Sequence, residues 1–218
     1  MKIAVIIAAG GSGKRMGRPK QFLPLAGKAV VEWTIEVFRK IKVVGQIVLA
    51  VPEDDLERAK NLGVTVVAGG EERGDSVKNG LKAVAFDTDI VMIHDGARPL
   101  ITPDIIEKAI SEAKEYGAAV VGVPVKDTIK RVGDDLIIKD TVDRQALWSA
   151  QTPQVFKYEI ITRAYAKKGS ATDDAKLVED LGIKVKMVMG SYENIKITTP
   201  EDLIVAEAIL RSRNVLPK

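Results

Sequence analysis

A glycine-rich segment directly after a short β-branched run is the strongest constraint on how this chain folds. Residues 3–7 (IAVII) have the pattern of a buried parallel strand. The next nine residues, AAGGSGKRM at 8–16, contain three glycines, which allow a sharp turn and close approach of the backbone to a ligand. Successive backbone N–H groups in such a loop bind anions, and Lys14, Arg15 and Lys20 add positive charge. The segment therefore predicts a phosphate-binding loop at the end of the first strand.

Two common phosphate-loop motifs do not describe this segment well. A Walker A loop places glycine at the position of Ala8 and a hydroxyl residue at that of Arg15. A dinucleotide motif fits Gly11 and Gly13 but not Met16, and no acidic residue ends the next expected strand. The loop, followed by PKQ at residues 19–21, instead resembles those of sugar-nucleotide pyrophosphorylases and cytidylyltransferases.

Composition excludes several classes of site. The chain has 218 residues and no cysteine, so disulfides and thiolate chemistry are excluded, and its single histidine, His94, excludes a multi-histidine metal centre. The net charge is only +3, without a long basic block, so nucleic-acid binding is not indicated. The apolar N-terminal run is too short to span a membrane and lacks a cleavage-site pattern, so we expect a soluble cytoplasmic protein.

Strand and helix patterns alternate through the first half of the chain. Strands are expected at 3–7, 46–51, 64–67, 89–94 and 118–123, and helices at 29–40, 53–61, after 73, and at 103–116. This alternation predicts an α/β fold with a mostly parallel sheet and ligands at the carboxyl ends of its strands.

The pattern changes at Pro124. Residues 126–138 read as a charged hairpin with a turn at 133–135. After it, a helix is expected to begin near 172–174, a strand at 184–189 and a last helix at 200–212. We expect a single domain, residues 1–218, with an arm at residues 124–147.

Two further segments are candidates for chemistry. HDGARP at 94–99 follows a strand at the edge expected for the glycine loop, and the lone carboxylate of Asp95 suits magnesium; alternatively, Asp95 caps a turn. GGEERGDS at 69–76 is a second glycine loop before a helix, where Ser76 is a possible donor to a base. It is equally well explained as a connecting turn with a helix cap.

The full set of motifs occurs in a characteristic order. Besides those above, the chain contains VKDTIKR, DR, TPQ and NIKITTPEDL. Together they resemble the 2-C-methyl-D-erythritol 4-phosphate cytidylyltransferase family of the non-mevalonate isoprenoid pathway, and the resemblance covers nearly the whole chain. It implies a Rossmann-like nucleotidyltransferase fold with a protruding β-arm, and transfer of the cytidylyl group of CTP to methylerythritol phosphate with magnesium as cofactor.

The resemblance also implies roles for individual residues. The expected nucleotide-binding residues are Ala8, Ala9, Gly10, Gly13, Gly70, Arg73, Ser76, Gly96 and Arg98. The expected catalytic residues are Arg15, Lys20 and Lys196, and Asp95 is expected to hold magnesium. Thr128, Arg144 and Thr152 are expected to bind the acceptor.

Such a reaction needs positioning and fixed cations more than a general base, because the acceptor phosphate is already anionic at neutral pH. Two alternatives remain. A pentitol phosphate such as ribitol 5-phosphate is another possible acceptor. A regulatory nucleotide-binding module without turnover is the other alternative, although Lys20, Asp95 and Lys196 together argue against it.

An isolated hairpin is marginally stable in water, and the apolar residues of this one need cover. We therefore expect a homodimer through the 124–147 arm. The resemblance implies that Thr128 and Arg144 cross to the partner's active site; the alternative is an arm folded back on its own sheet, with Arg144 acting in cis.

Overall fold

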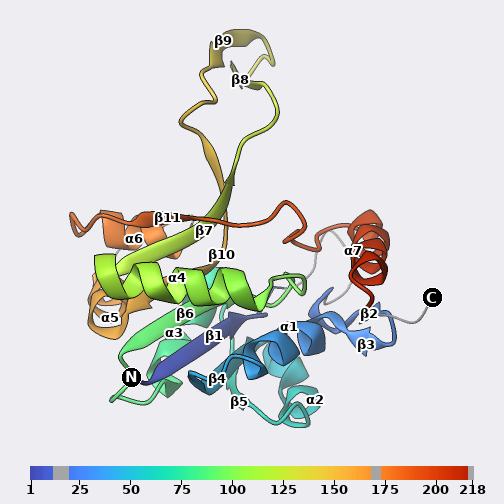
Figure 1. The fold of residues 1–218 in the computed structure, drawn as a ribbon, viewed down its shortest axis with the longest axis vertical. Helices are drawn as coiled ribbons and strands as arrows, with labels where there is room; N and C mark the ends of the chain where they lie inside the picture. Colours follow the sequence, from blue (N-terminus) through green and yellow to red (C-terminus); the bar gives the residue numbers. More distant parts are fainter. Residues whose placement is uncertain (12–19, 168–172, 216–218) are drawn as a thin grey trace.

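The computed structural model describes residues 1–11, 20–167 and 173–215, and it is built around a seven-stranded sheet (Figure 1). The strand order is β11-β7-β10-β6-β1-β4-β5. Six strands run in one direction: β1 (Ile3–Ala8), β4 (Val44–Val51), β5 (Thr65–Ala68), β6 (Ile90–Asp95), β7 (Ala118–Pro124) and β11 (Lys186–Met189). Only β10 (Trp148–Lys157) runs antiparallel, between β6 and β7. The predicted mostly parallel sheet is therefore confirmed.

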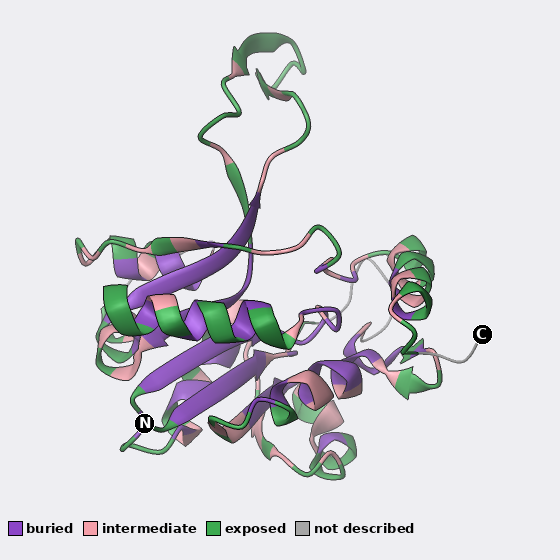
Figure 2. Cartoon of the chain, in the orientation of Figure 1, coloured by how far each residue is buried: buried purple, intermediate pink, exposed green. Residues whose placement is uncertain are grey.

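Helices cover both faces of this sheet, because successive side chains of a buried strand point to opposite sides. In β1, Ile3, Val5 and Ile7 join one apolar cluster, while Ala4 and Ile6 join the other. The first cluster is covered by α1 (Val30–Arg39), α2 (Leu56–Lys60), which follows the 3-10 turn Glu53–Asp55, and α4 (Pro103–Tyr116). The second is covered by α3 (Arg73–Ala83), α5 (Tyr158–Ala166) and α6 (Asp174–Glu179). Figure 2 shows the strands buried between these layers.

The last helix packs against the rest of the chain through a smaller hydrophobic cluster at one end of the sheet. The 3-10 turn Lys20–Phe22 leads into a two-stranded ribbon of β2 (Pro24–Leu25) and β3 (Lys28–Ala29). Leu25 and Trp33 pack there against Leu210 of α7 (Pro200–Ser212). Within the described residues, no helix is long and apolar enough to cross a membrane.

Local signals explain where the long helices begin and end. Thr102 precedes Pro103, whose missing N–H is harmless at the first helical position, and Gly117 ends α4 with a φ of 88°. In α7, Thr199 and Asp202 form a capping box. Both helices have the boundaries that the sequence predicts.

The arm leaves the sheet between two neighbouring strands and extends along the longest axis of the molecule (Figure 1). Its base continues β7 and β10, where Pro124 faces Trp148. Its outer part is a two-stranded sheet of β8 (Ile129–Val132) and β9 (Ile138–Val142). The predicted hairpin is therefore present, with most of its residues exposed.

The sequence did not predict β10 or α5. Pro153 lies within β10, and Gln151, Thr152 and Gln154 break its apolar pattern, although all three are buried. The register of β10 against β7 shifts between Ala150 and Gln154, which accommodates a proline that cannot donate to the ladder.

Candidate active site

The carboxyl ends of three parallel strands bring together the segments that the sequence singled out. Ala8 at the end of β1 is the register partner of Asp95 at the end of β6, and the Gly96 N–H donates to the Ala8 carbonyl (2.9 Å). On the other side, Ala9 N–H donates to the carbonyl of Ala50 in β4 (2.8 Å). The first glycine loop therefore begins beside the HDGARP segment, as predicted.

The second glycine loop packs directly against the first. A Cβ on Gly10 would lie 2.4 Å from the Ser76 hydroxyl oxygen, so this approach requires glycine. Ser76 is buried; its oxygen accepts from the Gly70 N–H (3.1 Å) and its hydroxyl lies 3.3 Å from the Glu72 carbonyl, to which it donates. The hydroxyl thus shapes this loop, and Ser76 also lines the pocket described below, so its donation to a base stays a prediction.

Asp95 is buried at the centre of a cluster of charged side chains. Its Oδ1 accepts from Arg73 Nε (2.9 Å), and its Oδ2 lies 2.9 Å from Lys196 Nζ and 3.4 Å from Arg98 Nε. Burial by itself would raise the pKa of Asp95, but Arg73, Lys196 and Arg98 lower it well below the usual range. Asp95 is therefore ionised at neutral pH, with three cations held around it.

A pocket of about 130 Å³ opens beside this cluster. It is lined by Ala8, Ala9, Gly10, Gly11, Lys20, Gln21, Glu71, Glu72, Arg73, Ser76, Asp95, Ala97 and Lys196. Gly13 and Arg15 lie outside the described residues. Five lining residues were not among the predicted site residues: Gly11, Gln21, Glu71, Glu72 and Ala97. Of these, Gly11 lies in the first glycine motif, and Glu71 and Glu72 lie in the second.

Size alone does not identify the site. A hollow of about 640 Å³ lies at the opposite edge of the sheet, lined in part by Asp89, Lys114 and Glu159. Ligands of α/β sheets bind outside the carboxyl ends of the strands. The smaller pocket at that edge, with its converging cations, is therefore the candidate active site.

Two buried residues, His94 and Thr152, form a hydrogen-bonded chain that ends on the backbone of Asp95. His94 Nε2 lies 3.1 Å from the Arg98 carbonyl, which only accepts, so Nε2 carries the proton and Nδ1 accepts from the Thr152 hydroxyl (3.1 Å). The Thr152 oxygen in turn accepts from the Asp95 N–H (3.0 Å). Thr152 is buried, and its hydroxyl holds the backbone of Asp95 in place; its role in acceptor binding stays a prediction.

Hydrogen bonds hold the loop that carries Lys196 against β10. The Asn194 amide donates to Gln151 Oε1 (3.1 Å) and to the Thr152 carbonyl (3.0 Å), and Gln151 donates to the Ser191 carbonyl (2.8 Å). The Asn194 carbonyl accepts from Arg98 Nη1 (2.7 Å). Neither Asn194 nor Gln151 was predicted as a site residue, although Asn194 belongs to the NIK motif.

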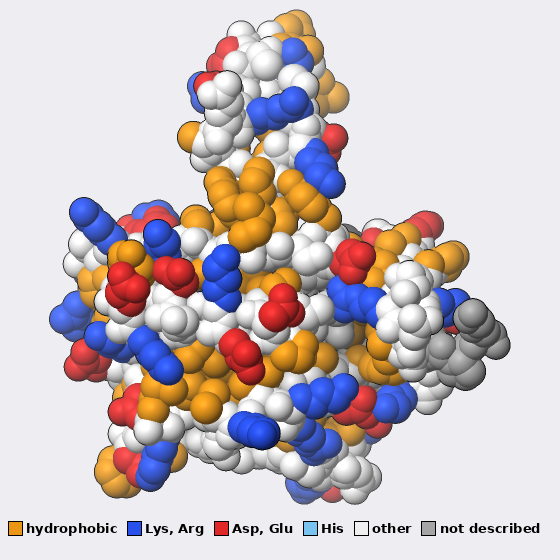
Figure 3. Space-filling view, in the orientation of Figure 1, with side chains coloured by type: hydrophobic (Ala, Val, Ile, Leu, Met, Phe, Trp, Pro, Cys, Tyr) orange, Lys and Arg blue, Asp and Glu red, His pale blue; other side chains and the backbone are white. Residues whose placement is uncertain are grey.

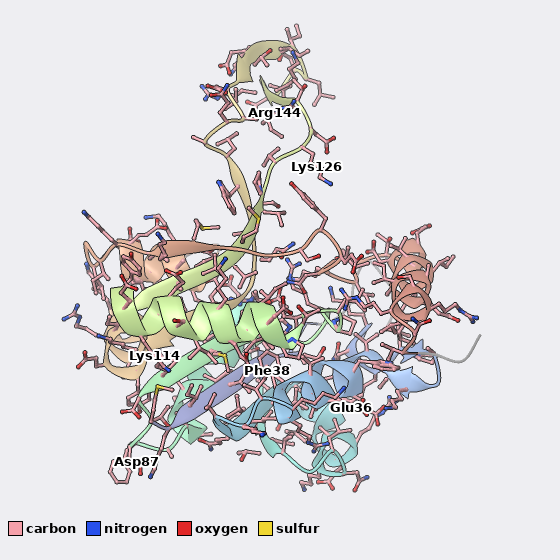
Figure 4. The ribbon with its side chains drawn as sticks, in the orientation of Figure 1. Glu36, Phe38, Asp87, Lys114, Lys126 and Arg144 are labelled. Atoms are coloured by element: carbon pink, nitrogen blue, oxygen red, sulfur yellow. The ribbon has the colours of Figure 1, made fainter. Side chains whose placement is uncertain are left out.

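Two predicted acceptor-binding residues lie on the arm rather than at the pocket. Thr128 and Arg144 are both exposed, and Arg144 Nη1 donates to the Lys126 carbonyl. Figure 4 shows Arg144 and Lys126 on the arm, away from the sheet. In the described part of one chain, neither residue lines the pocket.

A mostly parallel sheet with a glycine loop, two lysines and an ionised aspartate at its carboxyl edge defines a nucleotidyltransferase. Residues 3–212 match the family model described as "2-C-methyl-D-erythritol 4-phosphate cytidylyltransferase" (IspD). A relative with that name from Alkaliphilus oremlandii is 52% identical over 227 residues, covering 97% of this chain and 96% of its own.

Solved structures agree with this assignment. The 4-diphosphocytidyl-2C-methyl-D-erythritol synthase of Anaerococcus prevotii has a TM-score of 0.86 and 34% identity, and the comparison covers 96% of both chains. The 2-C-methyl-D-erythritol 4-phosphate cytidylyltransferase of Thermus thermophilus has a TM-score of 0.84 and 35% identity, covering 97% of this chain and all of its own. The chain belongs to the 2-C-methyl-D-erythritol 4-phosphate cytidylyltransferase family, and the resemblance inferred from the motifs is confirmed.

Proposed function

We propose that the protein transfers the cytidylyl group of CTP to 2-C-methyl-D-erythritol 4-phosphate, giving 4-diphosphocytidyl-2-C-methyl-D-erythritol and pyrophosphate. The observation that carries this proposal is the cluster of Lys20, Arg73, Asp95 and Lys196 at the carboxyl edge of the sheet, in a chain of this family. Relatives are named for methylerythritol phosphate, so the pentitol phosphate alternative is not favoured.

The proposed chemistry needs no protein base. An oxygen of the acceptor phosphate attacks the α-phosphorus of CTP, and the bond to the leaving pyrophosphate breaks. His94 is buried with both ring nitrogens hydrogen-bonded, and burial lowers its pKa to about 4, so it is not available as a base. Lys20, Arg73 and Lys196 line the pocket and stabilise the charge that develops on the phosphoryl oxygens.

Asp95 is the proposed magnesium ligand. Magnesium is usually held by one or two carboxylates, with substrate phosphates and water supplying its other ligands. Asp95 supplies one ionised carboxylate at the pocket, as this arrangement requires, and a bound ion would compete with Arg73, Arg98 and Lys196 for its oxygens. When bound, the ion would neutralise phosphate charge.

Pyrophosphate release tests the reaction. We expect release from CTP with methylerythritol phosphate and a divalent cation, and little with ATP or with ribitol 5-phosphate. Equal or faster turnover with ribitol 5-phosphate would overturn the proposed acceptor. Equal use of ATP would overturn the proposed base specificity.

The arm supports a proposed homodimer. Leu136, Ile137 and Ile138 near its tip are 82%, 66% and 57% exposed, and Figure 3 shows hydrophobic side chains on the arm and where it joins the body. A second copy of the arm would cover them. In the dimer, Arg144 would reach the partner's active site and bind the acceptor phosphate through a bidentate contact.

Mixing two inactive variants tests this arrangement. In a heterodimer of Arg144→Ala and Lys20→Ala chains, action in trans places both lesions in one active site and leaves the other intact. Activity is therefore expected to recover on mixing, whereas each variant mixed with itself stays inactive. No recovery after verified subunit exchange would refute action in trans, and a monomer in sedimentation would refute the dimer.

We also propose that the protein is cytoplasmic, as expected from the sequence. Cell fractionation with an antibody to the protein tests this location. Recovery in the membrane fraction would contradict it.

A further inference from the structure

Arg73 differs from the other two cations at Asp95 because it is held by a second carboxylate. Its Nε donates to Asp95 Oδ1 (2.9 Å), while its Nη2 donates to Asp174 Oδ2 (2.8 Å). Over the described ranges, Arg98 and Lys196 have no carboxylate partner other than Asp95. The guanidinium therefore spans two acidic side chains and is fixed from both ends.

Asp174 is a buried charge with a defined geometry. Its side chain is 1% exposed, and its other oxygen, Oδ1, accepts from the Tyr165 hydroxyl at 2.5 Å. Burial raises the pKa of Tyr165, and the neighbouring Asp174 raises it further, so the hydroxyl stays protonated and donates. A buried carboxylate is tolerated when it is paired and hydrogen-bonded, and Arg73 and Tyr165 supply these partners.

This network joins three helices on one face of the sheet. Arg73 is the first residue of α3, Asp174 is the first residue of α6, and Tyr165 lies on α5. Arg73 lines the pocket, whereas Asp174 and Tyr165 do not. Among the described residues, Arg73 therefore connects these two side chains to the pocket.

We propose that Asp174, oriented by Tyr165, is a positioning residue of the nucleotide site. A triphosphate entering the pocket attracts every cation at its edge, and it competes with Asp95 for them. The second carboxylate holds the guanidinium of Arg73 at the start of α3 while the nucleotide binds. This inference rests on the proposed use of CTP.

Tyr165→Phe removes one hydroxyl from the network and leaves the aromatic ring in place. Asp174 thereby loses one charge-assisted hydrogen bond, and the dissociation constant for CTP, measured by calorimetry without acceptor, is expected to rise about fivefold. The matched control is Tyr158→Phe on the same helix: among the described residues its hydroxyl has no hydrogen-bond partner, and it lines the hollow at the opposite edge. CTP affinity is expected to be unchanged in this control.

A double-mutant cycle separates positioning from mere stability. Arg73→Lys replaces the guanidinium that hydrogen-bonds both Asp95 and Asp174 with a single ammonium group. In that background, Tyr165→Phe is expected to weaken CTP binding no further. A thermal unfolding midpoint that falls in Tyr165→Phe while CTP affinity stays at the wild-type value would overturn the proposal. So would a full fivefold effect that persists in the Arg73→Lys background. If the wild-type protein failed to bind CTP, both the proposed function and this inference would be overturned. If the wild-type protein turned over CTP but Tyr165→Phe left the dissociation constant for CTP unchanged, the inference alone would be overturned.

Discussion

The buried histidine behind Asp95 makes the stability of the protein depend on pH in a calculable way. Burial lowers the pKa of His94 from 6.5 to about 4; nearby Arg98 and Arg73 lower it further, while Asp95 and the bond to the Arg98 carbonyl oppose the shift. The ring also packs edge-on against Phe38, with centroids 5.0 Å apart. The imidazole is therefore neutral in the folded protein throughout the range from pH 5 to pH 7.

The sign of the effect follows from proton binding. Between pH 6.5 and pH 4 the unfolded chain binds a proton at His94 and the folded protein does not, so acid favours unfolding. With these two pKa values, the free energy of unfolding falls by about 2 kcal/mol between pH 7 and pH 5. Carboxylates whose pKa is lowered on folding, such as Asp95, lose their contribution only as the pH approaches and passes below 3.8.

Urea unfolding at pH 7 and pH 5 measures this loss in the metal-free protein. The control is His94→Gln, which keeps a donor for the Arg98 carbonyl and does not titrate, so its unfolding free energy should show no comparable fall. Because the chain has one histidine, the imidazole proton signals of the wild-type protein are unambiguous in NMR spectra. An imidazole titration midpoint near 6.5, or the same pH dependence in both proteins, would refute the reasoning.

Three substitutions test other parts of the site. Lys196→Ala is expected to fold normally and to lower turnover on the order of 100- to 1000-fold, because it removes a donor to the developing phosphoryl charge; a near wild-type rate would remove it from the mechanism. Asp95→Asn is expected to shift a magnesium titration of activity to higher concentrations, and an unchanged curve would make Asp95 structural. Gly10→Val places a Cβ 2.4 Å from the Ser76 hydroxyl, so CTP affinity and stability should both fall, the latter by about 1–3 kcal/mol. Gly11→Val is the control for stability alone, because a Cβ there meets no described atom within 4 Å although Gly11 also lines the pocket, and an equal loss of stability in the two variants would contradict the close packing of the loops.

The parts of the fold that follow local rules were predictable from the sequence. The β-branched runs gave the parallel strands, and the signals at Thr102–Pro103 and Thr199 gave two helix starts. The strand β10 was not predictable because its buried polar side chains and Pro153 contradict the usual strand pattern. Their burial is compensated by partners on other elements, such as the Asn194 amide on Gln151, which no local pattern reveals.

The candidate site, like the fold, has features that could be predicted from the sequence and others that could not. The meeting of the glycine loop with Asp95 follows from parallel strands ending at one edge, and it was predicted. The link from Arg73 to Asp174 spans 101 residues and depends on how α3 and α6 pack, so composition and spacing did not predict it. The hydrogen bonds that Ser76 and Thr152 make within the protein were not predicted, because no local pattern shows which partners a buried hydroxyl finds. Their expected roles in ligand binding stay predictions.

Because β10 is antiparallel to β7, the arm leaves and rejoins the sheet at neighbouring residues. Pro124 and Trp148 are register partners, and the Val125 N–H donates to the Leu147 carbonyl (3.0 Å), so the arm begins and ends at neighbouring points of one ladder. A tight turn can join two such strands. The backbone of the body can therefore be closed by a short turn between Pro124 and Trp148, and an arm from a relative can be joined at the same pair of residues. Because Arg144 on the arm is proposed to bind the acceptor phosphate, such an exchange would change the proposed pairing and the acceptor binding together.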